Sequence, residues 1–194
     1  VFLVAEKIQR IMLNRQTSLV IPKFERPEDQ TTLLSEFNKM SLEKKGNFWM
    51  KLILGGDSAV GKTTLVENFV YRDLGEQYKS TIGINIMSKK MDFPQWNSKI
   101  EFAIYDLGGQ EIYKEVRRKY YLGASAGFLV YDVTNPKSFA NIREWYREII
   151  SIEPNILLVL VANKIDLEKD RKISTQQGDA LAQELGVQYI ETSA

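Results

Sequence analysis

The sequence predicts an α/β fold, with a mostly parallel six-stranded sheet, one antiparallel edge strand and helices on both faces. Apolar runs such as 155–162 alternate with helical patterns, which is typical of parallel sheets buried on both faces. Two neighbouring strand patterns, 82–93 and 99–105, are joined by a turn without an intervening helix and predict the antiparallel pair. A glycine-rich segment between the first strand pattern and the first helix adds a strand–loop–helix unit.

The expected elements follow one another in a regular order. Strands are expected over 48–54, 82–93, 99–105, 127–131, 155–162 and 187–191, and helices over 61–71, 136–150 and 174–186. Asn135 followed by Pro136 indicates a helix start, because proline fits the first helical turn. Ser174 and Gln177 have the spacing of a capping box, and Gly186 is expected to end that helix.

Residues 1–46 differ from the rest of the chain and contain no chemical motif. Apolar residues recur at helical spacing over roughly 1–15 and 33–40. We expect 1–46 to be a helical N-terminal extension or the tail of an upstream domain, followed by a domain over 47–194. The chain starts at Val1 rather than at Met, so we also expect an upstream piece.

The composition limits the chemistry that is available. The chain has 194 residues with no Cys and no His, which excludes disulfides, zinc ribbons, iron–sulfur clusters, thiol nucleophiles and histidine bases. Carboxylates, amides, hydroxyls, lysines and hard metal ions remain. With 26 Lys and Arg against 25 Asp and Glu, no extended nucleic-acid-binding face is expected.

A phosphate-binding loop is predicted at residues 56–63, whose sequence GDSAVGKT fits G-x-x-x-x-G-K-[ST] at every fixed position. Successive backbone N–H groups and a helix N-terminus make such a loop a site for anions. Gly56 and Gly61 permit close approach of the backbone. Lys62 is expected to reach the outer phosphates, and the Thr63 hydroxyl to bind Mg²⁺, which prefers oxygen ligands.

Two further motifs follow strand patterns at their carboxyl ends. In the first, Asp106 is expected to hold Mg²⁺, Gly109 to bring its N–H to a terminal phosphate, and Gln110 to orient an attacking water. The second is NKID at 163–166. The Asp166 carboxylate can accept two hydrogen bonds from guanine that adenine cannot offer, so this motif predicts selection of guanine.

These motifs occur in the order and at the spacing of the Ras-like small GTPases, which the sequence resembles over about residues 48–194. The segments STIGI at 80–84, YYLGA at 120–124 and YDVT at 131–134 are most similar to the Rab group. The segment DLGGQ at 106–110 departs from that group and is similar to the D-x-G-G-Q of Arf proteins. The resemblance implies a P-loop NTPase fold, and we expect its final helix to be missing from this chain.

The resemblance also implies roles that spacing alone does not reveal. Thr81 is expected to bind Mg²⁺ in the triphosphate state, Tyr78 to cover the phosphates, Lys164 to flank the base, and the Ala194 N–H to meet the guanine oxygen. The full set of expected nucleotide-binding residues is Asp57, Ser58, Ala59, Val60, Gly61, Lys62, Thr63, Thr64, Tyr78, Thr81, Gly109, Asn163, Lys164, Asp166, Ser193 and Ala194. The expected metal ligands are Thr63, Thr81 and Asp106, and the expected catalytic residues are Gln110, Lys62 and Gly109.

We therefore expect a Rab-like molecular switch that binds GTP or GDP with Mg²⁺ and slowly hydrolyses GTP to GDP and phosphate. The resemblance implies a role in vesicle traffic or signalling, with effectors, exchange factors and GTPase-activating proteins that bind near 74–85 and 107–121. It also implies a cytoplasmic monomer, with peripheral membrane attachment through a segment after Ala194.

Two alternatives stay open. One is a guanine-nucleotide-binding interaction module with negligible hydrolysis, against which Gln110 and Thr81 argue. The other is an ATP-dependent P-loop kinase, against which Asp166 argues.

Other side chains have structural interpretations. The residues expected to pack in the core or on helix faces are Trp49, Phe69, Trp145 and Tyr146. The second switch segment, residues 107–121, is expected to have a solvated face that effectors could bind. This face is expected to carry Arg117, Arg118 and Lys119.

Overall fold

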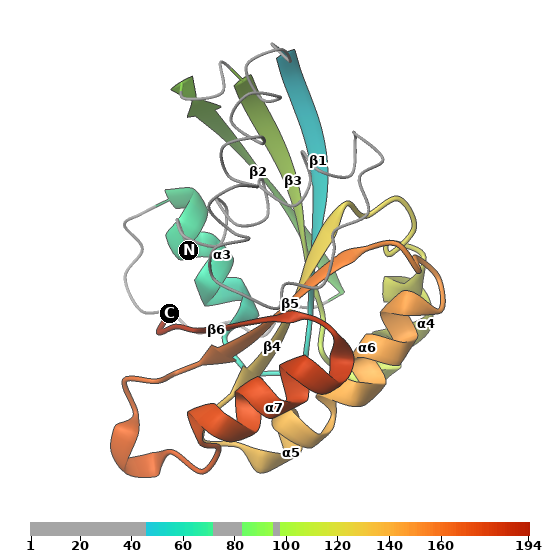
Figure 1. The fold of residues 1–194 in the computed structure, drawn as a ribbon. Helices are drawn as coiled ribbons and strands as arrows, with labels where there is room; N and C mark the ends of the chain where they lie inside the picture. The colour runs from blue at the N-terminus through green and yellow to red at the C-terminus, as the bar shows by residue number, and fades with distance from the viewer. Residues whose placement is uncertain (1–45, 72–82, 95–97) are drawn as a thin grey trace, which may run out of the picture. The chain divides into compact units, whose positions relative to one another are not determined.

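The computed structural model describes residues 46–71, 83–94 and 98–194 (Figure 1). Six strands form one sheet in the order β2-β3-β1-β4-β5-β6. The pairs β1–β4, β4–β5 and β5–β6 are parallel, and the sheet contains one antiparallel pair. The mostly parallel sheet that the alternating sequence pattern predicts is therefore confirmed.

The bounds of the six strands and of the first and last helices agree closely with the sequence patterns, whereas the helix at 114–118 was not predicted. The strands are β1 Gly46–Gly55, β2 Ile84–Phe93, β3 Ser98–Leu107, β4 Ala126–Asp132, β5 Leu157–Asn163 and β6 Gln188–Glu191. The helices are α3 Lys62–Tyr71, α4 Lys114–Arg118, α5 Pro136–Ala140, α6 Ile142–Ile150 and α7 Thr175–Leu185, with short 3₁₀ turns η2 Glu111–Tyr113 and η3 Glu168–Asp170. The predicted capping box is present on α7, where the Ser174 side chain and the Gln177 side chain each bond the other's backbone N–H.

The described residues fall into two compact units. The larger holds 50–71, 83–89 and 102–194, and the smaller holds 46–49, 90–94 and 98–101. Every predicted site residue that the structure describes belongs to the larger unit. The predicted boundary after residue 46 stays a prediction, because residues 1–45 lie outside the described part of the chain.

The main core of the larger unit lies where α6 and α7 meet the sheet. Ile53, Leu129 and Leu160 come from β1, β4 and β5 and are fully buried. Trp145 and Ile149 of α6 pack into the same cluster. Because side chains alternate along a strand, Val130 of β4 and Val159 and Val161 of β5 are buried on the other face, as expected for central parallel strands.

Three expectations from the sequence are wrong. The helix expected over 136–150 is two helices, because Asn141 ends α5 and begins α6. Asn favours helix ends, since its side chain competes for hydrogen bonds, and here that side chain bonds outside the helix. Trp49 is 60% exposed rather than packed in a core. Arg117 is buried rather than solvated, because Glu148 of α6 pairs with its charge.

Candidate functional site

The loop at 56–63 connects β1 to α3 and wraps around a lysine amine. The Lys62 Nζ donates to the backbone carbonyls of Gly56 and Asp57, at 2.7 Å each. Burial lowers the pKa of Lys62 to about 8, although Asp106 and Asp57 oppose the shift. The loop therefore holds a buried amine whose charged form is disfavoured by burial and favoured by the two nearby carboxylates.

Close backbone packing explains two glycines of the site. A Cβ on Gly61, which has φ +96°, would lie 2.2 Å from the Asn163 Nδ2. A Cβ on Gly109 would lie 2.4 Å from the backbone carbon of Asp57. The segment after β3 therefore lies directly against the phosphate-binding loop, and only glycine leaves room for that approach.

Two side chains whose oxygens can bind a metal ion meet beside this loop. The Thr63 hydroxyl donates to the Asp106 carboxylate at 2.5 Å, although the two residues are 43 positions apart. Asp106 is fully buried at the end of β3. A hydroxyl and a carboxylate form the donor set that Mg²⁺ accepts, with phosphate oxygens and water completing its shell. In the described ranges, no group of three or more acidic side chains is arranged to hold a metal ion by itself.

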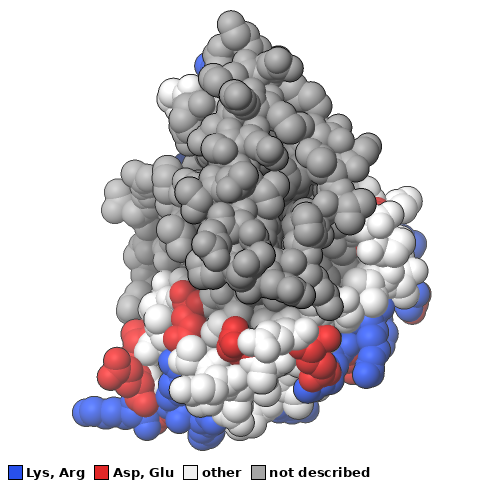
Figure 2. Space-filling model, viewed as in Figure 1, with Lys and Arg blue, Asp and Glu red and all other residues white. Residues whose placement is uncertain are grey.

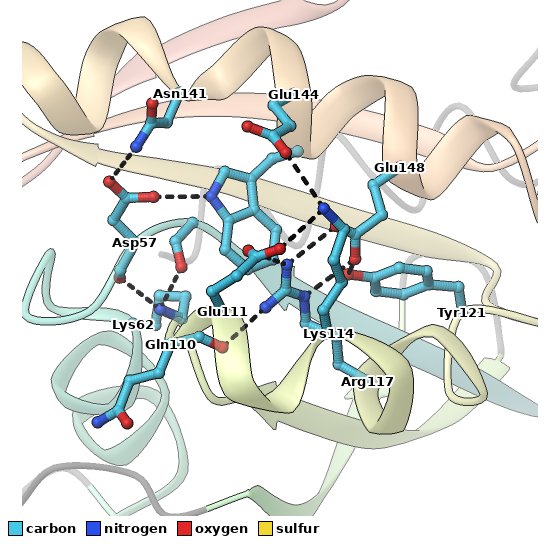
Figure 3. Close-up of polar contacts among 12 residues, drawn as sticks. Asp57, Lys62, Gln110, Glu111, Lys114, Arg117, Tyr121, Asn141, Glu144 and Glu148 are labelled. Atoms are coloured by element: carbon cyan, nitrogen blue, oxygen red, sulfur yellow. Dashed lines mark hydrogen bonds and ion pairs between the residues drawn. The ribbon is translucent and has the colours of Figure 1, made fainter.

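The Asp57 side chain anchors the loop to α6 (Figure 3). Its carboxylate accepts one hydrogen bond from the Asn141 Nδ2 at 2.8 Å and another from the Trp145 Nε1 at 2.9 Å. The main-chain carbonyl of Asp57 is left to accept from Lys62. The carboxylate therefore serves to position the loop.

A second set of contacts holds the beginning of the second switch segment. Gln110 has an exposed side chain, and its carbonyl accepts a hydrogen bond from the Arg117 Nη1 at 3.0 Å. Arg117 in turn pairs with Glu148 on α6. Both Asp57 and Arg117 therefore bond residues of α6 or its N-cap (Figure 3), so the two loops share one support.

The NKID motif lies at the carboxyl end of β5 and contacts the last residues of the chain. The Asn163 Nδ2 donates to the Val60 carbonyl at 2.8 Å, which ties the motif to the phosphate-binding loop. The Ser193 hydroxyl donates to the Asp166 carboxylate at 2.5 Å. The Ile165 N–H donates to the Thr192 carbonyl at 3.3 Å. These contacts leave Asp166 exposed and oriented by Ser193.

Lys164 is held by an acidic partner that the sequence analysis did not identify. It adopts φ +66°, and its Nζ lies 2.7 Å from the Asp132 Oδ2. Burial raises the pKa of Asp132, but hydrogen bonds from Lys164 and Thr134 outweigh that effect and keep the pKa below its usual value. Asp132 ends β4, so neighbouring parallel strands supply the two partners.

The described residues of the three motifs and of the segment after β6 lie together at the carboxyl ends of the strands. They follow β1, β3, β5 and β6, and carboxyl ends of parallel strands are where α/β proteins bind ligands. Of the loop residues, Val60 is buried, whereas Ser58, Ala59 and Thr64 are exposed. Tyr78 and Thr81 lie outside the described residues, so their expected roles stay predictions.

The supporting residues of the site were not predicted from the sequence. Trp145 was expected to pack in the core, which is confirmed, but its bond to Asp57 was not foreseen. A buried indole N–H needs a hydrogen-bond acceptor, so a tryptophan expected in the core already indicates that a polar group contacts it. No sequence pattern marks Glu148 or Asn141 as a supporting residue of the site, because both occupy ordinary helix-face positions in the sequence.

The described residues on the face drawn in Figure 2 carry charges of both signs. Figure 2 shows basic and acidic side chains lying close to one another on the face in view. Within the described ranges, no helix has the length and apolar character needed to cross a membrane.

Comparison with known proteins agrees with this geometry. The sequence model of the Ras family matches residues 51–194. The chain is 41% identical over 145 residues to the Ras-related protein Rab-13 of Bos taurus, covering 74% of this chain and 70% of that protein. It is 38% identical over 152 residues to the GTP-binding protein ypt2 of Schizosaccharomyces pombe, covering 78% and 75%. It is 39% identical over 146 residues to the Ras-related protein SEC4 of Saccharomyces cerevisiae, covering 75% and 66%.

Proposed function

The chain belongs to the Ras family of small GTPases, with Rab proteins among its relatives, and we propose that it is a GTP-binding switch that hydrolyses GTP. The proposed products are GDP and phosphate, and the proposed metal is Mg²⁺. The observation that carries the proposal is the meeting of three loops, which contain Lys62, Gln110 and Asp166, at the carboxyl edge of one sheet. Each loop supplies one requirement of the reaction.

The first requirement is a cradle for the phosphates. Backbone N–H groups of residues 57–64 and the N-terminus of α3 favour an anion. Lys62, held inside the loop, would place its charge beside the outer phosphates. Thr63 and Asp106 would hold Mg²⁺, which when bound neutralises charge on the phosphate oxygens.

The second requirement is selection of the base. Asp166 presents a carboxylate whose orientation is fixed by Ser193, and guanine offers two donors to such a group. Lys164, restrained by Asp132, would lie along the base. Adenine would leave the Asp166 carboxylate without donors, so ATP is expected to bind far more weakly than GTP.

The third requirement is a placed water molecule. Gln110 can accept from and donate to a water, and the chain has no histidine that could take its place. The Gly109 N–H is the proposed donor to the terminal phosphate. We expect slow intrinsic turnover that a GTPase-activating partner accelerates, and effector contacts near 74–85 and 107–121. Cytoplasmic residence and a role in vesicle traffic or signalling stay predictions.

The test begins with a titration of fluorescent GDP and GTP in the presence of Mg²⁺, with unlabelled ATP as competitor. We expect tight binding of both guanine nucleotides and no displacement by ATP. Asp166→Asn is the matched variant, since it keeps the size of the side chain and removes the acceptor pair. Failure of the folded wild-type chain to bind guanine nucleotides would contradict the proposal.

Hydrolysis is measured separately, in a single-turnover assay with excess protein over GTP. Gln110→Leu should retain GTP binding and lose at least about tenfold in the hydrolysis rate, because the water loses its orientation. Equal rates for the two chains would support the alternative of a guanine-nucleotide-binding module with negligible hydrolysis.

A further inference from the structure

Arg117 is a buried cation on a short helix whose other residues are exposed or half-buried. It lies on α4 and is 2% exposed. Its Nε and Nη2 each donate to the Glu148 carboxylate at 2.9 Å, and its Nη1 donates to the Gln110 carbonyl at 3.0 Å (Figure 3). One planar guanidinium therefore binds α6 with one edge and the start of the second switch segment with the other.

The guanidinium also lies over an aromatic ring that contacts the phosphate-binding loop. The Arg117 Cζ is 4.1 Å from the centroid of the Trp145 ring. The Nε1 of the same indole donates to Asp57 at 2.9 Å. A short chain of contacts thus runs from Asp57 through Trp145 and Arg117 to Gln110. It keeps the loop and the segment that carries Gln110 against the same helix.

Glu148 is fully engaged in this arrangement. Besides the two bonds from Arg117, it accepts a hydrogen bond from the Tyr121 hydroxyl at 2.7 Å. Burial lowers the pKa of Arg117, but the contacts with Glu148 and Tyr121 outweigh this effect and raise the pKa, so the side chain stays charged. The carboxylate is a fixed anchor for the guanidinium.

A buried ion pair is a weak explanation of stability by itself. Desolvation of two charges offsets much of their attraction, and an apolar pair of similar volume is often as stable. Anchoring of α4 alone also does not require the third contact, which goes to the backbone of Gln110. A role in positioning Gln110 explains this third contact, whereas anchoring of α4 does not.

We propose that Arg117 is a positioning residue for GTP hydrolysis, which holds the Gln110 backbone against the α6 platform of Trp145 and Glu148 and so fixes where the Gln110 side chain begins. The inference rests on the proposed function. A residue that only positions another should affect the hydrolysis rate much more than the affinity for nucleotide, because small displacements of reacting groups are costly.

The decisive variant is Arg117→Met combined with Glu148→Gln. It removes both charges, keeps an acceptor for the Tyr121 hydroxyl, and leaves Trp145 in place. We expect the single-turnover rate of GTP hydrolysis to fall about tenfold or more, while the Kd for GDP and for GTP changes less than about twofold. Backbone amides of residues 108–113 should exchange with deuterium faster than in the wild-type chain.

Two controls separate positioning from general loss of structure. Arg143 and Glu184 form an exposed bidentate pair with distances of 2.8 and 2.6 Å, remote in sequence from the second switch segment. Arg143→Met with Glu184→Gln should leave rate, affinity and exchange unchanged. Tyr121→Phe removes one bond to Glu148 but keeps the Arg117–Gln110 contact, so it should also keep the rate.

The outcomes are distinct. If the wild-type chain hydrolyses GTP and the folded double variant keeps its rate and its amide protection, the inference is overturned while the proposed function stands. If the wild-type chain hydrolyses no faster than Gln110→Leu, the hydrolytic function and the inference fall together. Should the double variant not fold, Arg117→Lys decides the matter. It keeps the charge but lacks the planar fork, and a wild-type rate would overturn the inference.

Discussion

The indole nitrogen of Trp145 donates a hydrogen bond to the carboxylate of Asp57 at 2.9 Å, across 88 positions of sequence. Trp145 is 5% exposed and belongs to the main core. Its hydrogen bond therefore connects this buried cluster to the loop that we propose to bind phosphate. The contact positions Asp57, whose main-chain carbonyl in turn holds Lys62.

We expect Trp145→Phe to destabilise the chain by about 1.5–3 kcal/mol, the usual value of a hydrogen bond to a charged group, with a further loss from packing. Urea denaturation measures the change. Asn141→Ala removes the other donor to Asp57 and serves as a comparison. Because both donors serve one carboxylate, the two substitutions should not be additive. Unchanged stability of Trp145→Phe would show that the contact has no energetic role.

Gly178 on α7 should not tolerate alanine. Its Cβ would lie 2.4 Å from the Tyr189 hydroxyl and 2.5 Å from the Tyr131 hydroxyl. Alanine normally improves a helix by about 1 kcal/mol relative to glycine, but overpacking costs about 1–3 kcal/mol, so the net effect should be a loss. Thermal or urea denaturation of Gly178→Ala tests this. Gly178→Ala in a Tyr189→Phe background should recover part of the loss, and a gain in stability from Gly178→Ala alone would contradict the packing argument.

Glu191 at the end of β6 should make stability depend on acid. Burial raises its pKa, but hydrogen bonds from Arg171, Tyr189 and Thr175 outweigh this and hold the pKa below its ordinary value of 4.5. The unfolded chain therefore binds this proton more readily than the folded chain. The stabilisation is present above about pH 4.5 and is lost as the pH falls through the folded-state pKa.

The measurement is urea denaturation of wild type and Glu191→Gln between pH 3 and pH 7. The variant should be less stable near pH 7, and the difference should shrink as the pH falls. Tyr189→Phe removes only one donor and should give a smaller loss. A difference that does not change with pH would show that the charge of Glu191 is unimportant.

Removal of Mg²⁺ should weaken nucleotide binding if Thr63 and Asp106 hold the ion as proposed. With excess EDTA, we expect the Kd for GDP to rise at least about tenfold and to recover when Mg²⁺ is added back. Thr63→Ser keeps the hydroxyl and should keep the metal dependence, whereas Thr63→Ala should bind GDP weakly with or without Mg²⁺. An identical response of the two variants to EDTA would place the ion elsewhere.

Much of the fold was determined by local sequence. Periodicity, glycines and caps depend on residues that are near one another in the chain, so the strands, α3 and α7 were predicted almost to their ends. The prediction of one continuous helix over 136–150 is wrong at Asn141. The side chain of Asn141 bonds a distant loop, and this partner favours a helix boundary that local sequence does not reveal. The motifs at 56–63, 106–110 and 163–166 were likewise readable, since each is a short run at the end of a strand.

Sequence patterns alone predict the class of fold and the place of the three loops at the carboxyl ends of the strands. They do not determine which side chains hold those loops. Arg117 was expected in solvent from its charge, and only the structure shows that Glu148, Trp145 and the Gln110 carbonyl compensate its burial. Charge and polarity alone predict exposure, whereas burial of a charge depends on partners that come together only when distant segments pack.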